Sequence, residues 1–243
     1  MNNKNYLLEC GLKNILDDFI EKTDPNTRVT YNENDICYIH KLVRSRKPFT
    51  TLEFGVGFST LTIAHALMQN KLEFNALAEI PTIRNSKLFT HYVVDANKYW
   101  LNNTKSKFPE ELTPYVRFNF SETYITMFGD FQVCSLYKNI PDIVAEFIYL
   151  DAPNPKDVSG NINGLSFQCP ERTIISGDLL LMESTFLPRT FILIDGRTNN
   201  VRFLKNNLKR DYKYTWWKEF DRTTFELIED KLGPHNIIGS DLY

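Results

Sequence analysis

Short apolar runs alternate with segments of helical periodicity through the middle of the chain. The apolar runs are Phe49 to Phe54, His91 to Asp95, Val116 to Phe120, Glu146 to Asp151 and Thr190 to Asp195. The predicted helices between them are Phe58 to Met68, Lys98 to Lys107 and Gly177 to Phe186. This alternation predicts a mostly parallel α/β sheet with helices on both faces. The stretch from residue 121 through Leu136 shows no clear strand pattern, and we predict it to be helical or irregular.

The two ends of the chain carry different patterns. Apolar residues recur at helical spacing from Leu7 to Glu21, which predicts one amphipathic helix, and a second helix is expected from Asn34 to Arg46. Near the C-terminus, the runs YKYTWWKEF and TTFELIED predict an antiparallel hairpin at the edge of the sheet. We therefore expect a helical extension over residues 1–46 that forms part of a substrate lid, and one α/β domain over residues 47–243.

Two connections are unusually long for a compact domain. They cover residues 72–89 and residues 152–176, and the second is rich in proline, glycine and asparagine. Long loops in compact domains are often binding loops or lids, so we expect substrate specificity to lie in these two segments.

Glycines and acidic residues follow the predicted strands. In an open α/β sheet, ligands bind beyond the carboxyl ends of the strands. The residues at these positions are Glu53, Gly55, Gly57, Asp95, Ser121, Glu122, Asp151 and Asp195. A carboxylate after the second strand can accept two hydrogen bonds from a ribose, and glycines in the first turn let a ligand approach the backbone. Two structural explanations stay open: GVGFS lacks the third glycine of GxGxxG and could be only a tight turn, and Asp95 could cap a helix.

The ordered motifs resemble those of one family. LEFGVGFSTL resembles the first motif of the class I S-adenosylmethionine-dependent methyltransferases, YVVDANKYW the second, and FIYLDAP and FILIDGRTNN the later strand-end motifs. The resemblance covers Lys47 to Asp230 and implies a Rossmann-like sheet of seven strands with a C-terminal antiparallel hairpin. The chain is most similar to small-molecule and sugar O-methyltransferases of bacterial surface-polysaccharide or natural-product pathways. It departs from many relatives at LDAP, where they carry a glycine after the acid.

The resemblance implies S-adenosyl-L-methionine as the cofactor. Its methionine end would lie over Glu53, Gly55 and Gly57, with the acid reaching the amino group directly or through water. Asp95 would hold the ribose hydroxyls.

Further cofactor contacts are expected from hydroxyl and acidic side chains. Ser121 or Glu122 would face the adenine, although an N-cap role explains Ser121 equally well. Ser59 and Thr60 would donate to the cofactor carboxylate or cap the helix that begins there, and we favour capping for one of them.

Two acids are candidates for catalysis. Methyl transfer is an in-line displacement in which the acceptor oxygen must be aligned and lose its proton. Asp151 and Asp195 end neighbouring strands, so Asp151 is predicted as a general base. Alternatively, both acids and Asn199 hold Mg²⁺, which would lower the pKa of the acceptor hydroxyl. Without metal, Asp195 forms a turn and pairs with Arg197. Lys156 and Arg197 are candidates to bind an anionic group of the substrate.

Composition limits the partners. The net charge is −2, from 28 basic and 30 acidic side chains, which disfavours nucleic acid as a partner. The N/D-PP-[YFW] motif of amino methyltransferases is also absent. No apolar run suggests membrane insertion and the four cysteines suggest neither zinc nor disulfides, so we expect a cytoplasmic protein, with a homodimer left open.

The favoured function is methyl transfer to an oxygen of a small molecule, such as a sugar, a sugar nucleotide or a polysaccharide building block. The alternative is a Rossmann-like nucleotide-binding protein that does not methylate, or a dehydrogenase-type domain.

Overall fold

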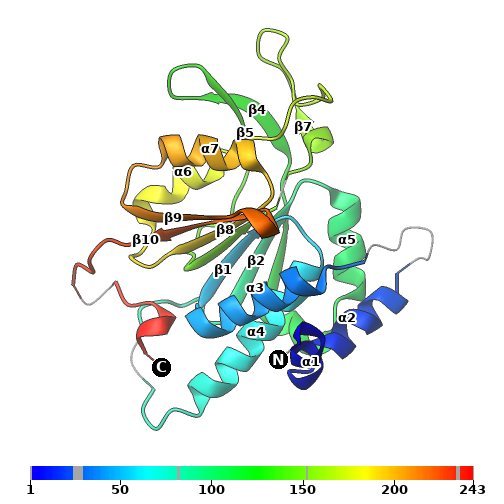
Figure 1. The fold of residues 1–243 in the computed structure, drawn as a ribbon, viewed down its shortest axis with the longest axis vertical. Coiled ribbons are helices and arrows are strands. Elements are labelled where there is room, and N and C mark those ends of the chain that lie inside the picture. Colours follow the sequence, from blue (N-terminus) through cyan, green and yellow to red (C-terminus); the bar gives the residue numbers. More distant parts are fainter. Residues whose placement is uncertain (1, 24–29, 81–82, 152, 234–235, 243) are drawn as a thin grey trace.

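A seven-stranded sheet runs through the middle of the molecule (Figure 1). The computed structural model describes residues 2–23, 30–80, 83–151, 153–233 and 236–242. The strands of this sheet are β1 (Thr50–Phe54), β2 (Thr90–Asp95), β3 (Val116–Phe120), β6 (Phe147–Leu150), β8 (Phe191–Asp195), β9 (Tyr212–Trp217) and β10 (Arg222–Leu227). Their order is β3-β2-β1-β6-β8-β10-β9, and only β10 runs antiparallel to its two neighbours. The predicted seven-stranded sheet with a C-terminal antiparallel hairpin is confirmed.

Helices cover both faces of the sheet and bury its central strands on both sides. On one face, α3 (Glu33–Arg46) and α4 (Phe58–Asn75) pack on Phe147 and Tyr149 of β6 and on neighbouring residues of β8. On the other face, α6 (Asp178–Met182) and α7 (Thr198–Asn207) pack on Ile148 and Leu150. Successive side chains of a strand point to opposite faces, so each strand contributes to both apolar layers.

The one helix expected from Leu7 to Glu21 is instead two, α1 (Asn3–Glu9) and α2 (Leu12–Glu21), so the expectation of one continuous helix is wrong. The break lies at Gly11, whose φ of 82° is a left-handed conformation that glycine adopts at little cost. The periodic apolar positions still share one buried surface across the break. Leu7 and Leu16 pack there against Leu61 of α4.

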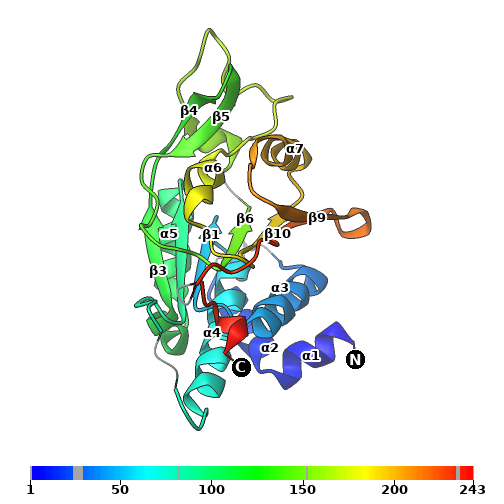
Figure 2. The ribbon, with the colours of Figure 1, turned by 90° about the vertical axis from the view of Figure 1, so that its left-hand side faces the viewer.

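A second sheet replaces the stretch that we expected to be helical or irregular. It consists of β4 (Thr123–Phe128), β5 (Gln132–Tyr137) and β7 (Val158–Ser159). The expectation was wrong because β4 and β5 form a hairpin of β-branched and aromatic residues, and Gly129 in its turn has a positive φ. Because β4 begins directly after β3, the hairpin stands beyond the carboxyl edge of the main sheet (Figures 1 and 2).

The long connections are partly ordered. Helix α4 continues to Asn75 rather than ending at Met68, which shortens the first connection. The second connection contains a 3-10 helix, Pro155–Asp157, and strand β7; α5 (Lys98–Lys107) matches its predicted bounds. Residues 81–82 and 152 of these connections lie outside the described residues. Among the helices that the structure describes, none is both long and apolar enough to cross a membrane.

A chain of hydrogen-bonded ring side chains joins α1, α3 and α4. The Tyr6 hydroxyl lies 2.7 Å from His40 Nδ1, and His40 Nε2 lies 3.0 Å from His65 Nδ1. Burial lowers the pKa of His40 to about 3 and that of His65 to about 4, with the Arg44 guanidinium adding to both effects. Both imidazoles are therefore neutral at pH 7, and the N-terminal extension is attached to the domain through uncharged hydrogen bonds.

We expect the His40→Gln variant to lose less stability than the natural protein on acidification. The pKa of His40 is lower in the folded than in the unfolded state. Its contribution to the free energy of unfolding is therefore complete above about pH 6.5 and is lost as the pH falls. At about pH 5 this loss amounts to about 2 kcal/mol, and glutamine, which does not titrate, avoids it. Urea unfolding at about pH 7.5 and pH 5 should thus show the stability gap between the two proteins narrowing by that amount.

The control is Lys105→Gln at an exposed position of α5, for which the gap should not change between the two pH values. A gap that also stays constant for His40→Gln would show that His40 is not held neutral in the folded protein.

Candidate active site

A cleft of about 330 Å³ lies at the carboxyl edge of the sheet. The turn between β1 and α4 forms its floor, and α2, α5, the connection after β6 and the turn after β8 form its walls. Its lining includes Phe19, Thr23, Gly55, Gly57, Phe58, Asp95, Asn97, Trp100, Asp151, Asn154, Asp157 and Arg197. The cleft is thus where an open α/β sheet is expected to bind a ligand.

Glycine shapes the floor of the cleft. Gly55 has a φ of 117°, which side chains rarely permit, and it turns the chain away from β1. A Cβ added to Gly57 would meet no atom within 4 Å among the described residues, so the space above this backbone is open. Helix α4 begins at the next residue, and its first N–H groups are suited to an anionic ligand group such as a carboxylate.

The carboxylate of Glu53 is turned inward and is not part of the cleft lining. Its side chain is 1% exposed and accepts hydrogen bonds from the hydroxyls of Ser59 and Thr60, the latter at 2.7 Å. His91 Nε2 lies 2.9 Å from the same carboxylate, and Thr51 Oγ1 lies 2.8 Å from His91 Nδ1. Since a carboxylate only accepts, we assign the proton of His91 to Nε2 and the Thr51 hydroxyl as donor to Nδ1.

Thr60 has the predicted capping role, because its hydroxyl oxygen accepts from the N–H of Gly57 at 3.0 Å. Ser59 lies with its hydroxyl on Glu53, away from the cleft lining. The network therefore fixes the first turn of α4 to β1 and β2.

Asp95 ends β2 and faces the cleft. Burial raises its pKa to about 6, against the effect of the Asn97 N–H that donates to it at 2.6 Å, and the carboxylates of Asp157, Glu53 and Asp151 raise it further. The Asn97 side chain, not Asp95, caps α5 by accepting from the N–H of Trp100. One oxygen of Asp95 thus has a backbone donor, and the carboxyl group lines the cavity where a hydroxyl pair could reach it.

The cleft is acidic overall. Asp95, Asp151 and Asp157 line it, and Arg197 is the cationic side chain among the described lining residues. The Arg197 guanidinium donates to the backbone oxygen of Asp151, lies 3.4 Å from its carboxylate and donates to the Pro153 carbonyl at 3.2 Å. Because this one cation is already engaged, the cleft favours a ligand that carries positive charge.

The two predicted catalytic acids end neighbouring strands but have different surroundings. Enclosure in the cleft raises the pKa of Asp151, while the Arg197 guanidinium lowers it. Asp195 accepts from the Tyr149 hydroxyl at 3.2 Å and lines a small hollow with Asp35 and other residues beside the cleft. The ion pair expected between Asp195 and Arg197 is instead made by Asp151.

The predicted metal ligands do not converge. Asp151 contacts Arg197, Asp195 contacts Tyr149, and Asn199 donates to the Thr173 hydroxyl at 2.6 Å. In the described part of the chain, no three His, Cys, Asp or Glu side chains form a group that could hold a metal ion.

Three other predicted site residues lie outside the cleft lining. Ser121 is buried and accepts from the Asn139 N–H at 2.9 Å, while Glu122 is exposed and pairs with Lys138 at 2.6 Å. The Lys156 side chain is exposed and is not among the lining residues.

Several residues of the cleft lining were not predicted from the sequence. Trp100 and Phe58 offer aromatic surfaces, Asp157 adds a carboxylate, and Phe19 of α2 closes one side. The position of Trp100 in YVVDANKYW, close after Asp95, was a signal that could have been used. The position of Phe19 had no local signal, because it depends on how α2 packs.

Comparison with known proteins identifies the fold. No family model matches the sequence, and no curated protein is significantly similar to it. The SAH-bound methyltransferase PaMTH1 of Podospora anserina is similar in structure, with a TM-score of 0.51, 13% identity, and coverage of 93% of this chain and 95% of that one. The O-methyltransferase TomG of Streptomyces achromogenes, involved in tomaymycin synthesis and solved with SAM, has a TM-score of 0.49 and 12% identity. The match covers 89% of this chain and 90% of that one. The expected class I methyltransferase fold is confirmed.

We expect Glu53→Gln to destabilise the protein by about 1–3 kcal/mol, because the new amide would place donors against the hydroxyls and imidazole that now donate to the carboxylate. Chemical denaturation measures the change. Glu111→Gln, an exposed residue of a 3-10 helix, is the matched control and should change stability by less than about 0.5 kcal/mol. Equal stability of the two variants would contradict the buried network.

Proposed function

We propose that the protein is an S-adenosylmethionine-dependent methyltransferase that methylates an oxygen of a small molecule. The observation that carries the proposal is the set of three carboxylates, Asp95, Asp151 and Asp157, around a cleft on the carboxyl edge of this fold. S-adenosylmethionine carries a sulfonium and an ammonium group, and both are favoured by an acidic cleft.

The lining residues provide suitable contacts for each part of this cofactor. Asp95 is placed to accept from the ribose hydroxyls. Gly55 and Gly57 line the cleft, and the open space above the Gly57 backbone is accessible to the methionine end, whose carboxylate suits the N-terminus of α4. Trp100, next along the wall, can stack on the adenine. In this proposal, Glu53 positions the turn and does not contact the cofactor.

The same charges disfavour the alternative dehydrogenase-type function. A dinucleotide would place a diphosphate on the β1–α4 turn, close to three carboxylates and to an arginine that is already paired. The helix N-terminus attracts a diphosphate, but the carboxylates repel it. In S-adenosylmethionine, the carboxylate is attracted by the helix N-terminus and the two cationic groups are attracted by the acids.

We expect Asp95→Asn to weaken S-adenosylmethionine binding at least tenfold, because an amide is a weaker acceptor for the ribose hydroxyls and adds no negative charge. Isothermal titration measures the affinity, with NAD as the competing ligand class. Asp130→Asn, in the exposed turn of the β4–β5 hairpin, is the matched control and should bind normally. Binding of NAD without binding of S-adenosylmethionine would overturn the proposal.

We propose Asp151 as the general base for the acceptor hydroxyl, which would be a hydroxyl of a sugar, a sugar nucleotide or a polysaccharide building block. Asp151 is half-exposed at the mouth of the cleft, so a substrate can reach it, and Arg197 holds its backbone. Its raised pKa brings the carboxylate closer to the basicity that proton transfer needs at neutral pH. Because the three predicted metal ligands do not converge, we derive no step through Mg²⁺.

We expect Asp151→Asn to lower kcat by a factor of about 100 or more, the usual range for a general base, and to change S-adenosylmethionine affinity only a few-fold. Methyl transfer to a panel of nucleotide sugars, with cofactor labelled in the methyl group, provides the measurement. The natural protein should keep its activity after treatment with EDTA. Activity that disappears with EDTA and returns with Mg²⁺ would favour the metal-dependent mechanism instead.

A further inference from the structure

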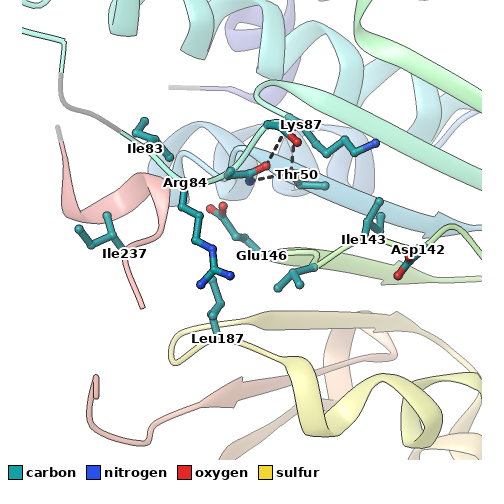
Figure 3. A pocket seen from close by; sticks show the side chains of 12 residues that line it. Thr50, Ile83, Arg84, Lys87, Asp142, Ile143, Glu146, Leu187 and Ile237 are labelled. Carbon is teal, nitrogen blue, oxygen red and sulfur yellow. Dashed lines mark hydrogen bonds between the residues drawn. The ribbon is translucent and has the colours of Figure 1, made fainter. Parts of the chain in front are cut away.

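A second, larger pocket lies at the opposite edge of the main sheet (Figure 3). Its volume is about 690 Å³, and Thr50 at the start of β1 and Glu146 just before β6 line it. The candidate active site instead includes Gly55 and Asp151, which follow the other ends of the same strands. Since β1 has 5 residues, at about 3.3 Å each, roughly 17 Å of strand separates the two cavities. The pocket is therefore no part of the methyl-transfer site.

The pocket combines apolar walls with a few charged groups, as small-molecule sites do. The apolar side chains come from four separate segments: Ile83, Ile143, Val144, Leu187 and Ile237. The charged side chains are Arg84, Lys87, Asp142 and Glu146. A volume of this size accommodates a ligand with an apolar body and a polar head.

The buried acid in the pocket is already satisfied. Glu146 is 4% exposed, and its Oε2 accepts from the N–H groups of Phe49 at 3.1 Å and Gly239 at 3.0 Å. Burial raises its pKa to about 7, against the effect of these two N–H groups. Near neutral pH the group is therefore protonated in a large fraction of molecules, and it repels an anion only weakly.

The pocket has two cationic side chains, Arg84 and Lys87. Neither Arg84 nor Lys87 takes part in an ion pair with any residue that the structure describes. In Figure 3, the side chains of Lys87 and Asp142 lie toward the same side of the pocket, whereas the Arg84 side chain lies on the other side, between the labelled Glu146 and Leu187 in this view. An arginine with apolar neighbours is well suited to a carboxylate, with which it forms two parallel hydrogen bonds.

We propose that this pocket binds a small amphipathic carboxylate, whose acid group pairs with Arg84 and whose apolar part packs on Ile83, Val144 and Leu187. The ligand would join three segments that are far apart in the sequence and that precede β2, β6 and β8. Because it would bind the folded protein and not the unfolded chain, it would increase the stability of the folded state.

Octanoate and 1-octanol, which share a chain length and differ in charge, are the probes. Isothermal titration of the natural protein in saturating S-adenosylmethionine should show one octanoate site, with 1-octanol at least tenfold weaker. Arg84→Gln should weaken octanoate at least tenfold, while Arg202→Gln, an exposed arginine of α7, should not change it.

A second pair of variants tests the cavity. Val144→Trp fills the pocket from a position that is 41% exposed, so folding should be preserved, and octanoate binding should fall at least tenfold. Leu181→Trp on α6, at 58% exposed, is the matched control and should bind octanoate normally.

Several results would overturn the proposal. They are equal affinities for octanoate and octanol, equal effects of Arg84→Gln and Arg202→Gln, no effect of Val144→Trp, and displacement of octanoate by S-adenosylmethionine. The Asp95→Asn variant should bind octanoate normally, so a failure of the methyltransferase proposal would leave this test intact.

Discussion

The structure around the candidate active site depends on one buried carboxylate. Glu53 lies in the central strand β1, and its removal from water must be compensated by donors from α4 and β2. A buried charge without such partners costs several kcal/mol, so Ser59, Thr60 and His91 are held in one arrangement. Thr60 at the same time accepts from the Gly57 N–H, which places the glycine turn. The open backbone on the floor of the cleft is therefore a consequence of charge burial beneath it.

The walls of the cleft determine the charge of its ligand. Asp95, Asp151 and Asp157 come from β2, from the end of β6 and from the connection after it, and the sheet order brings these segments together. Burial raises the pKa of Asp95 to about 6, with the neighbouring carboxylates adding to the effect, and a cation between these groups would favour the charged form. Arg197 cannot do so for all three, because its φ of 46° and its contacts with Asp151 and Pro153 hold it on one side.

The sequence was a good guide to features set by local patterns. Apolar runs gave the central strands, and Asp95 and Asp151 at their ends do line the cleft. The direction of the Glu53 side chain could not be predicted, because its partner His91 lies on another strand and only the fold brings them together. The contact of Asp195 could not be predicted for the same reason, because the Tyr149 hydroxyl that donates to it lies on another strand.

Two errors in the predicted elements have similar causes. The β4–β5 hairpin has a local signal, with a turn containing Gly129 between β-branched runs, but its place in a sheet depends on pairing with the distant β7. Gly11 interrupts the helix but not the apolar spacing, because the apolar residues on both sides of it pack into the same cluster. Periodicity reports which face is buried, and it does not report whether the backbone is continuous.

Both ends of β1 are fixed by the same device. Glu53 joins its carboxyl end to α4 and β2, and Glu146 joins its amino end to the C-terminal segment through the N–H groups of Phe49 and Gly239. Gly239 is suited to this contact because a Cβ there would overlap the carbonyl oxygen of Lys47. Between these anchors β1 is paired on both sides, by β2 and β6. The two cavities lie at opposite ends of this strand, and no residue that the structure describes lines both of them.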